Sequence, residues 1–282
     1  MILDGWVNVF PADFAATFGA KASTAGVHEM FGSAVTDPQP FEATLGAMDA
    51  EGIDMGVLVC GMKPPESARR RGEIPAEDAI VIAEEHPGRF LVGPTIEKAG
   101  KVRANCARIR ELSTHPAVAM IRITPLMEQY DLDHRLYYPV YQTCEELGLP
   151  VSINIGVPGP QVRSACQHPQ LLESVLIDFP DLTVIGAHMG HPYEQLVISY
   201  LMKWPQLYVM TSAYLAAYID PAMVRFMGSS RGRGRVWFAS DHPILDCGRA
   251  LEAARSLDLD EAAMAEYLGD AAHRVLTRRR GD

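Results

Sequence analysis

The sequence predicts a single (β/α)8 TIM barrel of the α/β class that spans residues 1–282. Three observations support this fold. The chain has the length of one such barrel, short apolar runs alternate with amphipathic stretches throughout, and no long polar linker divides them. An open doubly wound sheet would show the same alternation, but a glycine-rich loop should follow its first strand. That position reads Trp6-Val7-Asn8, which favours the barrel.

Eight short apolar runs, bounded by polar or turn-forming residues, are the predicted strands. They cover residues 2–8, 55–60, 90–95, 119–124, 151–155, 183–188, 208–211 and 236–240. The stretches between them repeat apolar residues at helical spacing. The predicted helices cover residues 41–51, 76–85, 103–112, 138–147, 171–178, 193–203, 221–227 and 248–256. Strand and helix therefore alternate as a parallel barrel requires.

Two predicted connections are longer than usual. Residues 11–40 separate the first strand from its helix, and residues 157–167 follow the fifth strand. Both leave the carboxyl ends of strands, where the active sites of barrels assemble. We expect them to form lids or pocket walls. Covering the barrel mouth or making an oligomer contact is an equally good interpretation.

Composition and charge indicate an ordinary globular protein. Apolar residues make up 48% of the chain and charged residues 21%, with a net charge of −10. A nucleic-acid partner is not expected, because phosphate binding needs a clustered basic surface. The arginines at residues 231–235 and 278–280 form short clusters that we interpret as solvated charge.

The cysteines and the apolar runs bear on the cell compartment. Five cysteines are scattered without a CxxC pair, which is typical of free thiols in a reducing cytosol. The first ten residues carry no basic segment of the kind that begins a signal peptide, and no apolar run approaches the roughly 20 residues that span a bilayer. We therefore expect a cytoplasmic protein that does not associate with membranes.

Four segments of the chain carry a family resemblance. Residues 180–190 place a histidine, His188, at the end of the sixth strand, and residues 207–214 follow as the seventh. Residues 238–243 place Asp241 after the eighth strand, and residues 268–276 form a closing helix. In this order and spacing the chain resembles the amidohydrolase-related (β/α)8 hydrolases and decarboxylases, which include small-acid decarboxylases and lactone hydrolases. The resemblance covers essentially the whole chain.

The resemblance implies a metal site that this chain has largely replaced. Metal-dependent members place a His-x-His pair on strand one, a lysine on strand four, histidines on strands five and six and an aspartate on strand eight. This chain keeps the histidine of strand six, as His188, and the aspartate of strand eight, as Asp241. The other positions read Trp6 and Asn8 on strand one, Arg122 on strand four and Asn154 on strand five.

The replacements disfavour a bound metal. Indole offers a metal no lone pair, and carboxamides are weak zinc ligands. Arg122 stays protonated, so it cannot form a bridging carbamate, and its charge would repel a divalent ion. We therefore predict no catalytic metal and no cofactor.

Three residues are predicted to carry proton chemistry. Asp241 is the expected general base, which activates water or takes a substrate proton. His188 is the expected acid, or the group that polarises a carbonyl. Arg122 is expected to hold a carboxylate or an oxyanion by paired hydrogen bonds.

Further residues are predicted to line the substrate pocket. Asn8 and Asn154 are expected to donate to a carbonyl oxygen, although either could merely fill space. Trp6 and Tyr214 are expected to form apolar or stacking walls. His191 and His242 are weaker candidates, because a lone histidine beside a proline is more often a simple loop residue. We include them because each lies close to a motif residue.

These residues favour a metal-independent hydrolase acting on a small carbonyl or carboxylate compound, with decarboxylation second. In one alternative, His188 and Asp241 hold a divalent metal with a loop histidine, at position 28, 191 or 242. In another, the barrel binds a ligand without catalysis. Arg122 and Asp241 would then form an internal ion pair that plugs the site, and a backbone carbonyl would satisfy His188. The resemblance also suggests a homodimer.

Overall fold

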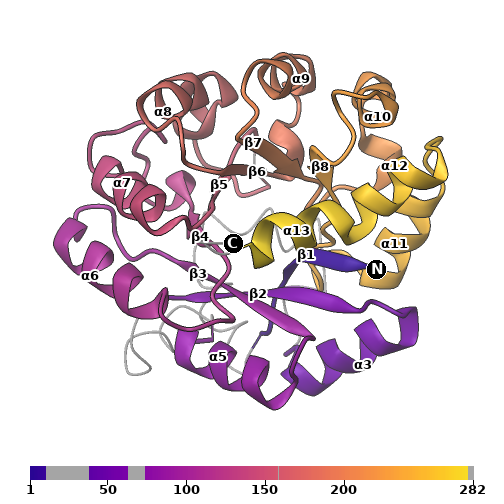
Figure 1. Cartoon of the computed structure of the whole chain (residues 1–282), viewed down its shortest axis with the longest axis horizontal. Helices are drawn as coiled ribbons and strands as arrows, with labels where there is room; N and C mark the ends of the chain where they lie inside the picture. Colours follow the sequence, from indigo (N-terminus) through magenta and orange to yellow (C-terminus); the bar gives the residue numbers. More distant parts are fainter. Residues whose placement is uncertain (11–37, 63–73, 158, 279–282) are drawn as a thin grey trace.

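The computed structural model describes residues 1–10, 38–62, 74–157 and 159–278, and it confirms the predicted barrel (Figure 1). Eight parallel strands pair in sequence order. They are β1 (Leu3–Val7), β2 (Met55–Gly61), β3 (Phe90–Thr95), β4 (Ile121–Ile123), β5 (Val151–Asn154), β6 (Val184–Ala187), β7 (Leu207–Met210) and β8 (Val236–Trp237). The first strand meets the chain after the eighth through hydrogen bonds from Gly5 N to Phe238 O and from Asp241 N to Trp6 O, each 3.0 Å long.

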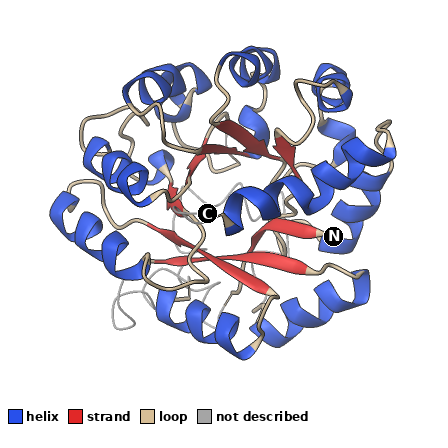
Figure 2. Ribbon diagram, in the orientation of Figure 1, coloured by secondary structure: helices blue, strands red, loops and turns tan. Residues whose placement is uncertain are grey.

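Helices surround the strands (Figure 2). They are α3 (Phe41–Glu51), α5 (Ala76–Glu85), α6 (Val102–Leu112), α7 (Tyr138–Leu147), α8 (Leu172–Asp178), α9 (Glu194–Lys203), α10 (Pro221–Gly228), α11 (Cys247–Arg255), α12 (Glu261–Ala265) and α13 (Ala271–Thr277). Shorter helical turns are η3 (Pro125–Met127), η4 (Ala165–Gln167), η5 (Pro169–Leu171), η6 (His188–Gly190), η7 (Ala216–Tyr218) and the π-helical η8 (Glu266–Asp270). Aspartates cap α10, α11 and α12 by accepting hydrogen bonds from backbone N–H groups of their first turns.

The predicted elements are confirmed with small shifts in their ends. Helices α3, α5 and α7 have the predicted bounds, α6, α8, α9 and α10 differ by one residue at one end, and α11 is shifted by one residue at both ends. The largest shift at a single end is in the eighth strand, whose ladder stops at Trp237 instead of residue 240. Beyond it, Phe238 N donates to Tyr267 O at 2.8 Å. The segment that carries Asp241 is therefore a loop, held by other parts of the chain.

The interior of the barrel is a small apolar core that the last helix seals. Leu3, Leu91 and Ile185 belong to one buried cluster, and so do Ala272 and Leu276 of α13. Figure 1 shows α13 lying across the ring of strands, near the amino terminus of the chain. The closing helix predicted over residues 268–276 therefore plugs the end of the barrel where strands begin, and the opposite end remains for a site.

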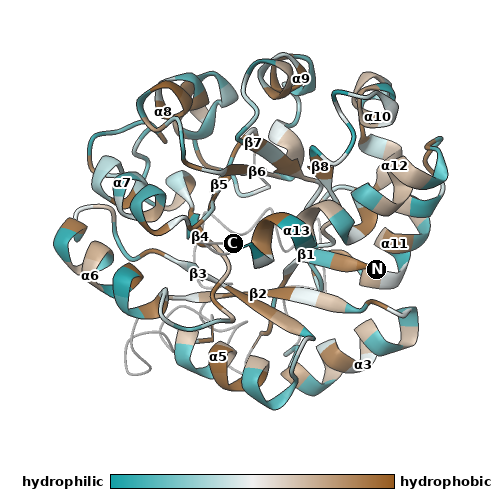
Figure 3. Cartoon of the chain, viewed as in Figure 1, coloured by the Kyte–Doolittle hydropathy of each residue, from teal (hydrophilic) through white to brown (hydrophobic). Residues whose placement is uncertain are grey.

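A larger core lies between the strands and the surrounding helices. It includes Val7, Leu58 and Ile123 from strands, packed with helical residues such as Ile109 and Leu201. Figure 3 shows apolar colour on much of the strand surface and mixed colour on the helices. Such two-layer burial is what makes each strand read as a nearly continuous apolar run.

Two sequence expectations concern bonding and membranes. All five cysteines are buried and free, as expected. Among the described residues, no helix is both long enough and apolar enough to cross a bilayer.

The two long connections have different outcomes. Residues 11–37 of the first lie outside the described residues, and they include the histidine at position 28. At its far end, Gln39 pairs with Phe10 in an antiparallel bridge. The second connection packs back on the strand ends, because Gly156 and Gln167 exchange hydrogen bonds and Val157 N donates to His191 O at 2.7 Å.

Candidate active site

Trp6 lies at the centre of the predicted site residues. The Cζ atom of Arg122 lies 3.6 Å from the centroid of the indole ring, a cation–π contact. The imidazole of His188 lies 5.1 Å from the same ring. Arg122 is also anchored to β3, because its Nη1 donates to Thr95 Oγ1 at 2.9 Å. The structure therefore brings residues from strands one, three, four and six together around one indole.

An irregularity in β1 explains how Trp6 reaches this position. The pairing of β1 with β2 shifts register between Asp4 and Val7. Leu3 and Trp6 both pack into the interior cluster, although strict alternation would send them to opposite faces. The shift thus turns the indole toward the interior of the barrel.

Asn8 connects Trp6 to Asp241. The Asn8 side-chain oxygen accepts a hydrogen bond from Trp6 Nε1 at 3.2 Å. Its Nδ2 donates to Asp241 Oδ1 at 2.8 Å and to the backbone oxygen of His242 at 2.9 Å. The amide is thus committed to the frame of the site. The sequence-based expectation that Asn8 donates to substrate does not fit this geometry.

The Asp241 carboxyl is buried and has an unusual affinity for its proton. Burial raises its pKa from 3.8 to about 7, the charge of Asp4 raises it further, and Asn8 and Arg122 partly offset these effects. Among the described residues, Asn8 is the one side-chain hydrogen-bond donor to this carboxyl. A carboxyl with a pKa near neutrality can both take and return a proton at physiological pH.

Arg122 and Asp241 do not form the direct ion pair considered in the sequence analysis. Among the described residues, the salt bridges within 4.0 Å include none between these two side chains. The guanidinium still lowers the pKa of Asp241 through its charge. The two groups therefore interact across space without neutralising each other in contact.

Asp4 is a site residue that sequence reasoning missed. Its carboxylate accepts hydrogen bonds from Trp6 N at 3.1 Å, from Ser240 N at 2.9 Å and from the Ser240 hydroxyl. Ser240 Oγ in turn accepts from His242 N at 2.9 Å. This fully buried brace ties β1 to the loop that carries Asp241. The sequence feature that could have revealed Asp4 is an acidic residue inside an apolar strand, because such a residue is rarely buried without partners.

His188 is held in one orientation by Ser212. Its Nδ1 lies 3.0 Å from the Ser212 carbonyl oxygen, which can only accept, so we assign the proton to Nδ1. Its Nε2 then accepts from Asn154 Nδ2 at 3.2 Å. The imidazole thus presents a lone pair, and not a proton, on the side of Asn154.

Burial also fixes the charge of His188. Burial lowers its pKa from 6.5 to about 4; the Ser212 backbone opposes this shift and the charge of Arg122 adds to it. The imidazole is therefore neutral near pH 7. The sequence-based expectation that His188 is the acid does not fit, because neither its charge nor its Nε2 atom supplies a proton.

Nitrogen NMR tests this assignment. In ¹⁵N-histidine-labelled protein, the His188 signals are expected to show a neutral ring protonated at Nδ1 at every pH above about 5, since its pKa lies near 4. The variant His188→Asn identifies the signals by their loss. A titration of this ring near pH 6.5, or a proton on Nε2, would contradict the assignment.

Backbone strain gathers where β6, β7 and β8 end. His188, Ala213 and Asp241 have φ values of 64°, 65° and 65°. This left-handed region costs energy for residues other than glycine, and such residues cluster at functional sites. The strain therefore marks the same end of the barrel as the side chains above.

The remaining predicted residues lie at the edge of this group. His191 Nδ1 contacts Glu194 Oε1 at 2.6 Å, and its ring lies 5.0 Å from that of Tyr214. Tyr214 Oη donates to Val157 O at 3.4 Å. His242 Nε2 faces Gln39 Nε2 at 3.3 Å. None of these side chains hydrogen-bonds to Asp241 or His188, so the three are at most outer parts of the site.

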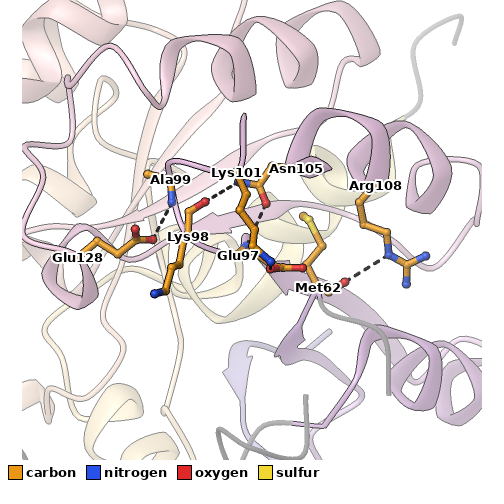
Figure 4. Close-up of polar contacts among 8 residues, drawn as sticks. All are labelled: Met62, Glu97, Lys98, Ala99, Lys101, Asn105, Arg108 and Glu128. Atoms are coloured by element: carbon orange, nitrogen blue, oxygen red, sulfur yellow. Dashed lines mark hydrogen bonds and ion pairs between the residues drawn. The ribbon is translucent and has the colours of Figure 1, made fainter. Parts of the chain in front are cut away.

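The loop after β3 is held in place by buried polar contacts (Figure 4). Asn105 of α6 accepts from Glu97 N and donates to Lys98 O, both at 3.1 Å. Ala99 N donates to Glu128 Oε1 at 2.7 Å. The loop begins directly after β3, whose last residue binds the guanidinium described above. These contacts therefore keep that anchor fixed.

The side chains at the strand ends do not fit a divalent metal. The indole of Trp6 stands against both Arg122 and His188, where the resemblance places metal ligands. The side-chain amides of the two asparagines at these strand ends donate hydrogen bonds to Asp241 and His188. Among the described residues, the set of three His, Cys, Asp or Glu side chains close enough for one ion includes neither Asp241 nor His188. The alternative in which these two join a described loop histidine therefore lacks its geometry.

Comparison with known proteins agrees with the fold and identifies the family. The amidohydrolase family model matches residues 25–278, so the chain belongs to the amidohydrolase family. A comparison with curated proteins gives no match. The sequence-based recognition is thereby confirmed, and family membership supports an enzymatic role.

Solved structures share the barrel over almost the whole chain. A TIM-barrel protein from Bordetella bronchiseptica has 24% identity and a TM-score of 0.78, with 98% of each chain covered. The 5-carboxyvanillate decarboxylase of Sphingomonas paucimobilis has 17% identity and a TM-score of 0.73, again with 98% of each chain covered. A dihydroxybenzoic acid decarboxylase from Polaromonas, with bound manganese, has 14% identity and a TM-score of 0.68, covering 98% of this chain and 96% of that one. At these identities the likeness shows the fold.

Proposed function

We propose that this protein is a metal-independent enzyme of the amidohydrolase family. It hydrolyses a small organic compound that carries a carbonyl or carboxylate group, with Asp241 as the general base. The observation that carries the proposal is the Asp241 carboxyl, which is held at one oxygen by Asn8 and has a pKa of about 7. Such a group takes a proton from water at neutral pH without a metal to activate the water.

In the proposed reaction, Asp241 removes a proton from water while the water oxygen bonds to the substrate carbonyl carbon. The electron pair of the carbonyl moves onto its oxygen, where the positive charge of Arg122 stabilises it. When this intermediate collapses, the bond to the leaving group breaks and protonated Asp241 returns the proton to that group. His188 orients the water by accepting a hydrogen bond at Nε2, the atom that now accepts from Asn154.

Decarboxylation is the second candidate, and one feature of the site favours it. The Arg122 guanidinium stacked on Trp6 suits a carboxylate attached to an aromatic ring. Similar barrels include the two decarboxylases named above. In this reaction the bond to the carboxyl carbon breaks, carbon dioxide leaves, and the carbanion takes its proton from Asp241. A carboxyl with a pKa of about 7 is protonated in half of the molecules at that pH.

A substrate screen in ¹⁸O-water separates these functions. The wild-type protein is incubated with small lactones, esters and amides that carry a carboxylate, and separately with aromatic carboxylates. Heavy oxygen in a product carboxylate, lost in Asp241→Asn, is the result expected for hydrolysis. Release of carbon dioxide without heavy oxygen in the product identifies the decarboxylase. Ligand binding without turnover of any compound would identify a binding barrel and overturn both.

A further inference from the structure

A second group of metal-binding side chains lies beside the candidate active site. His242, Asp246 and Cys247 each offer one ligand atom, and these atoms lie within 4.8 Å of one another. His242 follows the proposed base directly, and Asp246 and Cys247 begin helix α11. The proposed function uses none of these three side chains as a reacting group.

The histidine of this group has a nitrogen without a hydrogen bond. His242 is 4% exposed, and its Nδ1 has no partner among the described residues. Its Nε2 faces Gln39, so Nδ1 is the nitrogen left for another ligand. A buried polar atom without a partner costs free energy and calls for an explanation. A bound cation would supply the missing partner.

The other two side chains also have atoms to spare. Asp246 Oδ1 accepts from Arg249 N at 2.9 Å as the helix cap, which leaves its second carboxylate oxygen for a ligand. Cys247 is 1% exposed and makes no disulfide. Imidazole, carboxylate and thiolate together form a set of ligands that suits zinc better than calcium or magnesium.

The surrounding charges favour a cation. The carboxylates of Asp4, Asp246 and Glu51 act electrostatically on the Cys247 sulfur, where they place negative potential. A potential of this sign attracts a divalent ion, and a thiol that coordinates such an ion is deprotonated.

The group is open to solvent on one side. A surface hollow of about 500 Å³ is lined by Glu51, Asp246 and Gly248, and further along α11 by Glu252 and the two arginines Arg249 and Arg255. Asp246 thus belongs both to the hollow and to the group. Gly248 has no side chain, and a Cβ there would meet the Glu51 carboxyl at 2.5 Å. A hydrated ion therefore has a path to Asp246.

We propose that His242 Nδ1, the Asp246 carboxylate and Cys247 Sγ bind a zinc ion, with water from the hollow completing its coordination. Binding replaces the thiol proton, which leaves to solvent as the bond from sulfur to metal forms. The site is separate from the proposed catalytic residues and does not depend on the proposed function. Its position after Asp241 makes its role structural, securing the loop against α11.

Metal titration of the full chain, stripped with a chelator, tests this site. Zinc binding is measured by equilibrium dialysis, and cobalt is added separately because a thiolate–cobalt bond gives a charge-transfer absorption band. One zinc per chain and this band are expected. Asp246→Asn keeps the helix cap, so it should fold, and it should weaken zinc binding at least about tenfold. Cys247→Ser should abolish the cobalt band.

Matched variants separate the possible outcomes. Asp220→Asn alters the equivalent cap of α10, and Cys144→Ser alters another buried cysteine. Both should bind zinc as the wild type does. Asp241→Asn and His188→Asn should also leave zinc binding unchanged. Wild-type binding no tighter than that of Asp246→Asn, or binding lost in Asp241→Asn but retained in Cys247→Ser, would overturn the proposal.

Discussion

Replacing Asp241 by asparagine is expected to reduce turnover by about 10²- to 10⁴-fold, the range that a positioned general base contributes. Asparagine has the same shape and can still accept the hydrogen bond from Asn8. The loss should therefore appear in kcat, while ligand binding persists. Steady-state kinetics and ligand titration measure the two effects. Asp178→Asn, an exposed change on α8, is the control that should keep full turnover.

The same variant should change how stability depends on pH. The pKa of Asp241 is about 7 in the folded protein and near 3.8 when exposed, so the folded state holds more protons between these values. Stability should fall as pH rises through this window, by on the order of 4 kcal/mol for a shift of this size. Asp4, with a pKa of about 6, contributes in the same direction. Urea unfolding at pH 5 and 8 should show a smaller loss in Asp241→Asn, and an equal loss would contradict the assignment.

Replacing Arg122 by methionine is expected to have the second largest effect. The variant keeps an apolar stem against Trp6 but removes the charge that stabilises an oxyanion or carboxylate, at a cost of about 10²- to 10³-fold in kcat/KM. It should also move the acid limb of the pH–rate profile to higher pH, because the guanidinium lowers the pKa of Asp241 in the wild type.

Two further variants make the Arg122 experiment specific. Arg122→Lys keeps the positive charge but lacks the planar guanidinium that makes paired hydrogen bonds. Its pH profile should therefore be closer to that of the wild type than its affinity for substrate is. Arg89→Met removes an arginine that pairs with Asp49 on the outer surface and should leave kinetics unchanged. An unshifted pH profile in Arg122→Met would show that this charge does not reach Asp241.

Much of the fold followed from local pattern. Helices such as Phe41–Glu51 and Tyr138–Leu147 were predicted at their observed bounds, because apolar spacing and the glycine after each helix mark both ends. The eighth strand was predicted too long. Residues 238–240 are buried like a strand and begin with two apolar residues, but hydrogen bonds from this segment go to η8 and to Asp4, which no local pattern reveals.

The residues of the site were more predictable than their roles. Family spacing located Trp6, Arg122 and Asp241, and the structure places the first two in contact. The neutral state of His188 depends on burial, and its tautomer depends on the Ser212 carbonyl, which lies just after a different strand, β7. Asp4 was missed because its function depends on a register shift in β1. Charge and hydrogen-bond direction are properties of the assembled barrel.

The measurement that tests the central claim most directly is turnover by enzyme stripped of metal, with metal content determined on the same sample. Once a substrate is identified, we predict undiminished turnover at a metal content near zero. Removing zinc from His242, Asp246 and Cys247 should leave kcat unchanged, because none of these three side chains is a reacting group in the proposed mechanism. Turnover that disappears on stripping and returns with added zinc or manganese would contradict metal-independent proton chemistry at the strand ends.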